Sequence, residues 1–135
     1  MKDLLLKLKA CEEAVEWAGD KTTEEVIDTC HRGDWLLWLA YKLEVDDRPF
    51  TLAKGHCANT VRHLMKDERS IKAVDAAIAY GNGEVSKEEL KDAADAAAYS
   101  VAAYAAYYAS AKSNQLETAD ICRKYLGHLI LEKLC

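Results

Sequence analysis

Apolar residues recur every three or four positions along nearly the whole chain, and this spacing constrains the fold more than any other feature of the sequence. In the first part of the chain, the apolar positions are Leu4, Leu8, Cys11, Val15 and Ala18. This spacing places them on one face of an α-helix, whereas no segment shows the alternation typical of a strand. One proline and six glycines also leave little material for β-turns. The sequence therefore predicts an all-α fold.

Helix start and stop signals divide this pattern into seven helices. Gly19 is expected to end the first, and Thr22 with Glu25 forms a capping box that opens the second. Gly33 is expected to adopt the left-handed conformation after the second helix, which leaves Asp34 to cap the third. The predicted helices span residues 4–18, 22–30, 35–44, 49–64, 71–80, 86–112 and 116–134.

The length of 135 residues fits one domain, residues 1–135, which buries enough surface to fold without disulfides. We predict an irregular bundle of about six or seven helices that includes one long helix rich in alanine and tyrosine. Residues 35–44 are apolar nearly all round, so this helix is expected to be central. On the long helix, Tyr99 and Tyr107 lie on a stripe away from the main apolar seam. That stripe is either sandwiched in the bundle or exposed as a binding surface.

Cysteine usage and the absence of targeting signals indicate a cytoplasmic protein. The five cysteines are an odd number, are widely spaced and include no CxxC pair, which is typical of a reducing compartment. No segment has the pattern of a signal peptide or the length and hydropathy of a membrane span.

Acidic residues are concentrated in the first third of the chain. Residues 1–47 hold twelve acids and six bases, and the rest of the chain is nearly balanced. A net charge of −5 opposes direct nucleic-acid binding, but an acidic field suits a protein partner with a basic surface. Solubility alone is the alternative explanation of these charges. The candidate partner-binding acids are Glu12, Glu13, Glu16, Asp20, Glu24, Glu25 and Asp28.

No motif in the chain predicts catalysis, a metal or a cofactor. The histidines and cysteines lack the close spacing of structural zinc sites, and sequence neighbours such as His56 and Cys57 point about 100° apart on a helix. A thiol nucleophile is the best enzyme candidate that the chain offers, but Cys57 beside His56 cannot directly supply the required geometry of thiol and base. The Arg-Gly-Asp sequence at 32–34 is explained by helix stop and start signals.

Three segments of the chain resemble a family of immunity proteins found in bacterial polymorphic-toxin loci and in phage genomes. These segments are residues 10–19 (ACEEAVEWAG), residues 30–40 (CHRGDWLLWLA), and the Ala/Tyr-rich stretch that runs into residues 118–123 (TADICR). The chain looks like a short member of that family. The resemblance implies a helical protein that neutralises a partner by binding it, and it carries over no site residues.

The leading hypothesis is therefore a non-catalytic, immunity-type inhibitor of a toxin or effector. A phage-encoded inhibitor of a host defence system, such as a nuclease effector, is one alternative. A structural homo-oligomer that associates through the Tyr99 and Tyr107 face is a second, and a thiol- or metal-dependent enzyme is a third.

Overall fold

The computed structural model describes residues 1–94 and 112–134, and within these residues every regular element is a helix. The predicted all-α class is confirmed. The labelled elements are α1 (Lys2–Lys7), α2 (Glu12–Ala18), α3 (Thr23–Thr29), α4 (Gly33–Lys42), α5 (Asp47–Asn59), the 3₁₀ turn η1 (Arg62–Leu64), α6 (Glu68–Gly81) and α8 (Lys112–Leu134). A further helical segment occupies residues 87–94.

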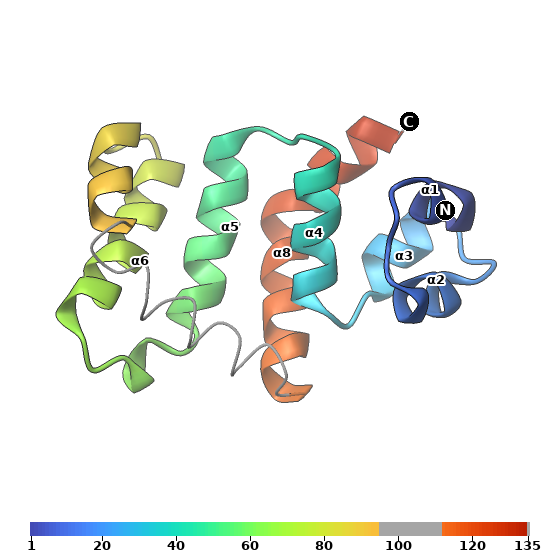
Figure 1. Ribbon diagram of the computed structural model, residues 1–135, viewed down its shortest axis with the longest axis horizontal. Coiled ribbons are helices and arrows are strands. Elements are labelled where there is room, and N and C mark those ends of the chain that lie inside the picture. The colour runs from blue at the N-terminus through green and yellow to red at the C-terminus, as the bar shows by residue number, and fades with distance from the viewer. Residues whose placement is uncertain (95–111, 135) are drawn as a thin grey trace.

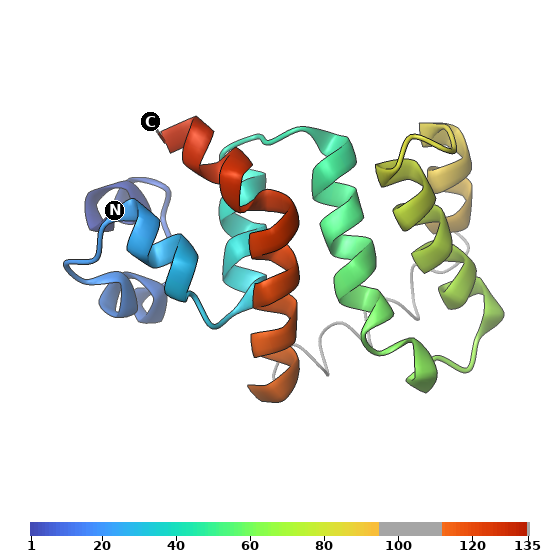
Figure 2. The ribbon, with the colours of Figure 1, turned by 180° about the vertical axis from the view of Figure 1, so that it is seen from behind.

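The helices follow one another along the long axis of the molecule. The three short helices α1, α2 and α3 gather at one end, and α6 lies at the other end (Figure 1). Between them, α4 and α8 pack face to face, with α4 in front in one view and α8 in front in the opposite view (Figures 1 and 2). Helix α5 packs against both α8 and α6. The acidic helices α2 and α3 therefore lie at one end of the molecule, whereas α4 lies in its middle.

Helix α8 supplies the centre of the main hydrophobic core. Ala119, Cys122, Leu126 and Ile130 recur at a spacing of three and four residues and are completely buried. Leu116, nearer the start of the same helix, keeps half of its surface exposed. Fully burying a large aliphatic side chain contributes about 1.5–3 kcal/mol, so this stripe holds the bundle together.

Several predicted start and stop signals are confirmed. The Thr22 hydroxyl accepts a hydrogen bond from the Glu25 amide, and the Glu25 carboxylate accepts one from the Thr22 amide, both at 3.2 Å. Gly19 ends α2 with a φ of 46°. The Ser86 hydroxyl accepts a hydrogen bond from the Glu89 amide and so caps the segment that begins at residue 87. Pro49 lies in the first turn of α5, where its missing N–H costs nothing.

The predicted first helix is wrong, because two helices, α1 and α2, occupy residues 4–18. Helix α1 ends in a Schellman motif, in which the Ala10 amide donates to the Leu5 carbonyl and the Lys9 amide donates to the Leu6 carbonyl. Lys9 takes the left-handed conformation that this motif requires, with a φ of 63°. The apolar spacing continues across the break because both helices pack against the same core, and so the spacing alone did not reveal it.

Lys9 makes an expected stability change directly measurable. Replacing Lys9 with glycine should raise the free energy of unfolding by about 0.5–1 kcal/mol, because an L-residue pays about 1–2 kcal/mol in this conformation and glycine's greater unfolded-state entropy returns part of it. Urea denaturation would measure the change. Gly83→Ala is the opposite substitution and should lower the free energy of unfolding. Gly83 follows the end of α6 with a φ of 80°, and an added Cβ would meet no described atom within 4 Å, so backbone strain alone would be measured. A destabilised Lys9→Gly variant would contradict this explanation of the break.

The prediction for Gly33 and Asp34 is also wrong. Gly33 is the first residue of α4 rather than a left-handed stop, and Arg32 precedes the helix in an extended conformation. Asp34 lies in the first turn of α4. A Cβ atom at Gly33 would lie 2.6 Å from the Cβ atom of Thr118 and 2.7 Å from its backbone carbonyl carbon. Glycine is needed here because the start of α4 passes against the backbone of α8.

Other helix boundaries also differ from the sequence analysis. Leu64 belongs to the 3₁₀ turn η1 rather than to the helix that contains Cys57. Residues 112–115 are already helical as part of α8, whereas the predicted last helix starts at residue 116. The predicted long helix, residues 86–112, is described only as far as residue 94, so most of its Ala/Tyr-rich part, with Tyr99 and Tyr107, lies outside the described residues.

Candidate partner-binding surface

All seven candidate acids lie on the surface of the end formed by α2 and α3. Three belong to α2, three belong to α3, and Asp20 lies in the connection between the two helices. Two of them have structural roles, because Glu25 is part of the capping box and Glu13 lies 3.6 Å from the Arg32 guanidinium. The other five make no ion pair with a described residue. They are Glu12, Glu16, Asp20, Glu24 and Asp28.

The spacing of these acids places them in two pairs, one on each helix. Glu12 and Glu16 are one turn apart on α2, and Glu24 and Asp28 are one turn apart on α3. The grouping of α1, α2 and α3 brings both pairs to the same end of the molecule (Figure 1). Unpaired carboxylates at one end of a molecule produce a negative potential that extends about a Debye length into solution.

Sequence analysis did not foresee an apolar groove beside these acids. The groove has a volume of about 350 Å³ and forms where α1, α2 and α3 meet α4. We call it the tryptophan groove, because all three tryptophans of the chain line it. Its lining residues are Leu5, Ala10, Cys11, Ala14, Trp17, Val26, Cys30, Arg32, Asp34, Trp35, Leu36, Trp38 and Leu39.

The tryptophans of the groove are only half-buried, which is why the prediction of a central third helix holds only in part. Leu36, Leu39 and Ala40 of α4 are buried, but Trp35 and Trp38 on the same helix keep exposed surface. Tyr41 is 66% exposed. A pair of tryptophans three positions apart was the available signal, yet on an apolar helix that spacing normally indicates core packing.

An aromatic cluster stiffens one side of the tryptophan groove. The rings of Trp17, His31 and Trp35 contact one another, with centroids 5.6, 5.6 and 5.9 Å apart and tilted or edge-on orientations. Tilted aromatic pairs of this kind are worth about 0.5–1.5 kcal/mol beyond the burial of their surface. Because the three rings come from α2, the α3–α4 connection and α4, the cluster ties the acidic helix α2 to the centre of the bundle.

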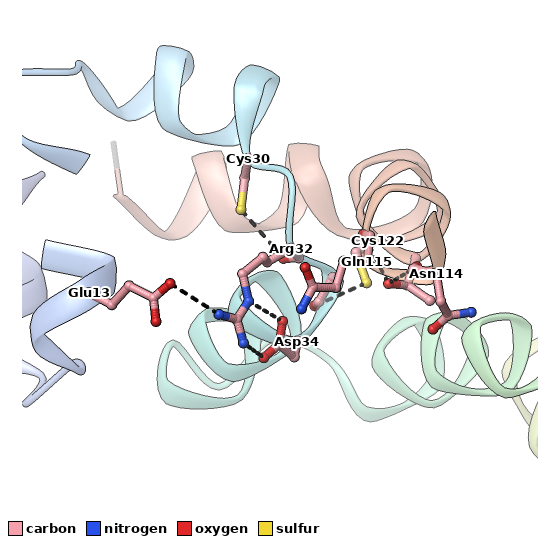
Figure 3. Close-up of polar contacts among 9 residues, drawn as sticks. Glu13, Cys30, Arg32, Asp34, Asn114, Gln115 and Cys122 are labelled. Atoms are coloured by element: carbon pink, nitrogen blue, oxygen red, sulfur yellow. Dashed lines mark hydrogen bonds and ion pairs between the residues drawn. The ribbon is translucent and has the colours of Figure 1, made fainter. Parts of the chain in front are cut away.

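Arg32 joins the acidic surface to the groove. Its guanidinium donates two hydrogen bonds to the Asp34 carboxylate, at 3.1 and 2.7 Å, and approaches the Glu13 carboxylate (Figure 3). The same guanidinium lies 4.5 Å from the ring centroid of Trp35. Hydrogen bonding to Asp34 raises the pKa of Arg32 further above its already high value. Arg32 and Asp34 thus satisfy each other, and the Arg-Gly-Asp sequence forms a helix start with Gly33 buried rather than an exposed loop.

The thiols of Cys57 and Cys122 lie next to each other rather than next to a histidine of the described residues. The Sγ atoms of Cys57 and Cys122 lie 3.7 Å apart, and the His56 ring stacks on Tyr125 at 4.9 Å rather than on a thiol. The Cys57 hydrogen bond and burial together raise the pKa of Cys122, and burial raises the pKa of Cys30, so both stay protonated and weakly nucleophilic at neutral pH. Across residues 1–94 and 112–134, no three histidine, cysteine or acidic side chains are placed to share a metal ion.

Comparison of the chain with protein-family models, with curated proteins and with solved structures found no match. No helix in the described parts of the chain combines the length and the apolar character needed to cross a bilayer.

Proposed function

We propose that this chain is a non-catalytic binding protein that neutralises a basic macromolecular partner, in the manner of an immunity-type inhibitor of a toxin or effector in the cytoplasm. One observation carries the proposal: all seven candidate acids are exposed at the end of the molecule that contains α2 and α3, and five of them have no ion-pair partner among the described residues. The resemblance of residues 10–19 and 30–40 to immunity proteins supports the same class.

The proposed mechanism is electrostatic attraction followed by steric blockade. Unpaired carboxylates attract a basic surface over several ångströms and speed association with it. The aromatic cluster and Arg32 hold α2 in place before binding, so little ordering cost is added when the partner arrives. A rigid acidic end that covers a basic surface would keep a nucleic acid or another acidic substrate from reaching it.

Capture from a lysate of the source organism at low salt, followed by mass spectrometry, tests the proposal with two variants. The triple variant Glu12→Lys, Glu13→Lys, Glu16→Lys is expected to lose a basic protein that the wild-type chain retains. Its matched control, Glu84→Lys, Glu88→Lys, Asp92→Lys, changes the net charge equally at exposed positions near the opposite end, and is expected to retain that protein.

The two variants separate a specific surface from a general charge effect. The Glu13–Arg32 pair that the first variant removes is largely exposed, with 72% of the Glu13 side chain accessible, so circular dichroism should show an unchanged fold. Equal loss of the captured protein in both variants would show that net charge, rather than the surface of α2, determines binding. Undiminished capture by the first variant would contradict a role for α2.

A further inference from the structure

We propose that the tryptophan groove receives an apolar side chain of the partner, presented by a basic amphipathic segment such as a helix. This inference rests on the proposed function and names the part of the partner that the surface recognises. The inference starts from α2, which carries exposed acidic residues and also contributes Ala14 and Trp17 to the wall of the groove.

The chemistry of the groove favours an apolar occupant. Aromatic and aliphatic side chains make up most of its wall, and its buried part consists of Leu5, Val26, Cys30, Leu36 and Leu39. The charged groups in the lining, Arg32 and Asp34, are already hydrogen-bonded to each other. A polar ligand would therefore find few unsatisfied groups to orient it, whereas an apolar side chain gains by leaving water.

The size of the groove suits an anchor residue rather than a whole ligand. At about 350 Å³ it lies at the low end of the range for small-molecule pockets, about 300–1,000 Å³. Interfaces concentrate much of their binding energy in a few aromatic or aliphatic side chains that fill such pockets. The half-buried tryptophans offer rigid walls for this contact, because Trp17 and Trp35 already pack against each other.

The charges around the groove indicate that the anchor is flanked by basic residues. Glu13, on α2, reaches Arg32 at the edge of the groove, and Glu12 and Glu16 on the same helix have no ion-pair partner among the described residues. A segment with apolar residues at helical spacing and lysine or arginine between them would match both features, as in helix-in-groove recognition. A neutral segment would gain from the groove alone, and an acidic segment would also be repelled by the carboxylates of α2.

The three tryptophans make occupancy of the groove measurable, because the intrinsic tryptophan fluorescence of the chain comes entirely from its walls. The probe is a synthetic lysine–leucine peptide of about 18 residues, five helical turns with leucine along one face. Its control carries alanine in place of every leucine and so keeps the charge. The first peptide is expected to shift the tryptophan emission and to bind at least about tenfold more tightly than the control, which should leave the emission unchanged.

A groove-filling variant tests where the peptide binds. Ala14→Phe places a ring in the groove from α2 and is expected to weaken binding of the leucine peptide at least about tenfold. Asn59→Phe adds the same ring at an exposed position of α5 outside the groove lining and is expected to change nothing. If Ala14→Phe fails to fold, Ala10→Leu fills the groove from the α1–α2 connection and takes its place.

The outcomes separate failure of this inference from failure of the proposed function. Equal affinity for the two peptides, or full binding by the groove-filled variant, would overturn the anchor while leaving the acidic surface intact. Tryptophan emission that shifts with protein concentration alone, together with a larger mass in light scattering, would assign the groove to a second copy and also overturn it. An emission shift in the wild-type chain would support the groove. Loss of peptide binding in the Glu12, Glu13, Glu16 reversal would in addition support the charged surface.

Discussion

Replacing Gly33 with alanine is expected to lower the free energy of unfolding by about 3 kcal/mol, the upper part of the usual range for an overpacked site. The added Cβ atom would lie 2.6 Å from the Cβ atom of Thr118 and 2.7 Å from its carbonyl carbon. A backbone atom of a buried helix cannot move aside as the end of a long side chain can. The contact between α4 and α8, which organises the core, would have to open.

Gly127→Ala is the control for this substitution, because Gly127 is also buried and lies inside α8. Its added Cβ atom would meet Ile27 at 3.4 Å and Arg123 at 3.7 Å, which are ordinary contacts. Alanine is also favoured over glycine within a helix by about 0.5–1 kcal/mol. Urea denaturation of the two variants should therefore give shifts of different size, and equal destabilisation would show that the close approach at Gly33 is not the controlling feature.

Arg123→Ala is expected to cost about 2–3 kcal/mol, the second largest effect on stability. The Arg123 guanidinium donates hydrogen bonds to the carbonyls of Ile27, at 2.6 Å, and Cys30, at 3.1 Å, at the end of α3. Those carbonyls have no partner within α3, because Ile27 lies in its last turn and Cys30 follows its last residue. Hydrogen bonds to a charged donor contribute about 1.5–3 kcal/mol, and a cation also suits the negative end of the helix.

Two further substitutions calibrate the role of Arg123. Lysine keeps the charge but cannot match the fork of donors, so Arg123→Lys should fall between the alanine variant and the wild type. Lys124→Ala removes the same charge from an exposed neighbour and should change the free energy of unfolding by less than about 0.5 kcal/mol. If Lys124→Ala proved as costly as Arg123→Ala, net charge rather than the cap on α3 would be responsible.

Local signals in the sequence predicted the parts of the fold that depend on neighbouring residues. The capping box at Thr22, the end of α2 at Gly19 and the buried stripe of α8 follow from interactions within a few positions along the chain. The break at Lys9 did not, because a Schellman motif usually uses glycine and the apolar spacing hides the turn. Gly33 was predicted to end a helix in the left-handed conformation, but it is needed for the close approach to Thr118. Thr118 is distant in sequence, so no local signal shows this contact.

The candidate site was predictable in its charges but not in its shape. Charged residues on an amphipathic helix face solvent almost by default, so the exposure of Glu12, Glu16 and Asp28 followed from their positions. The tryptophan groove depends on how Trp17 of one helix meets Trp35 and Trp38 of another. No local rule fixes that meeting.

Recognition of a basic partner by the acidic end is the central claim, and the association rate of the captured partner as a function of salt tests it most directly. Between about 0.1 M and 1 M salt the Debye length falls from about 10 Å to about 3 Å. The wild-type rate is then expected to fall at least about tenfold, while the Glu12, Glu13, Glu16 reversal should already associate slowly at low salt. A wild-type rate that stays constant over this range would contradict the claim.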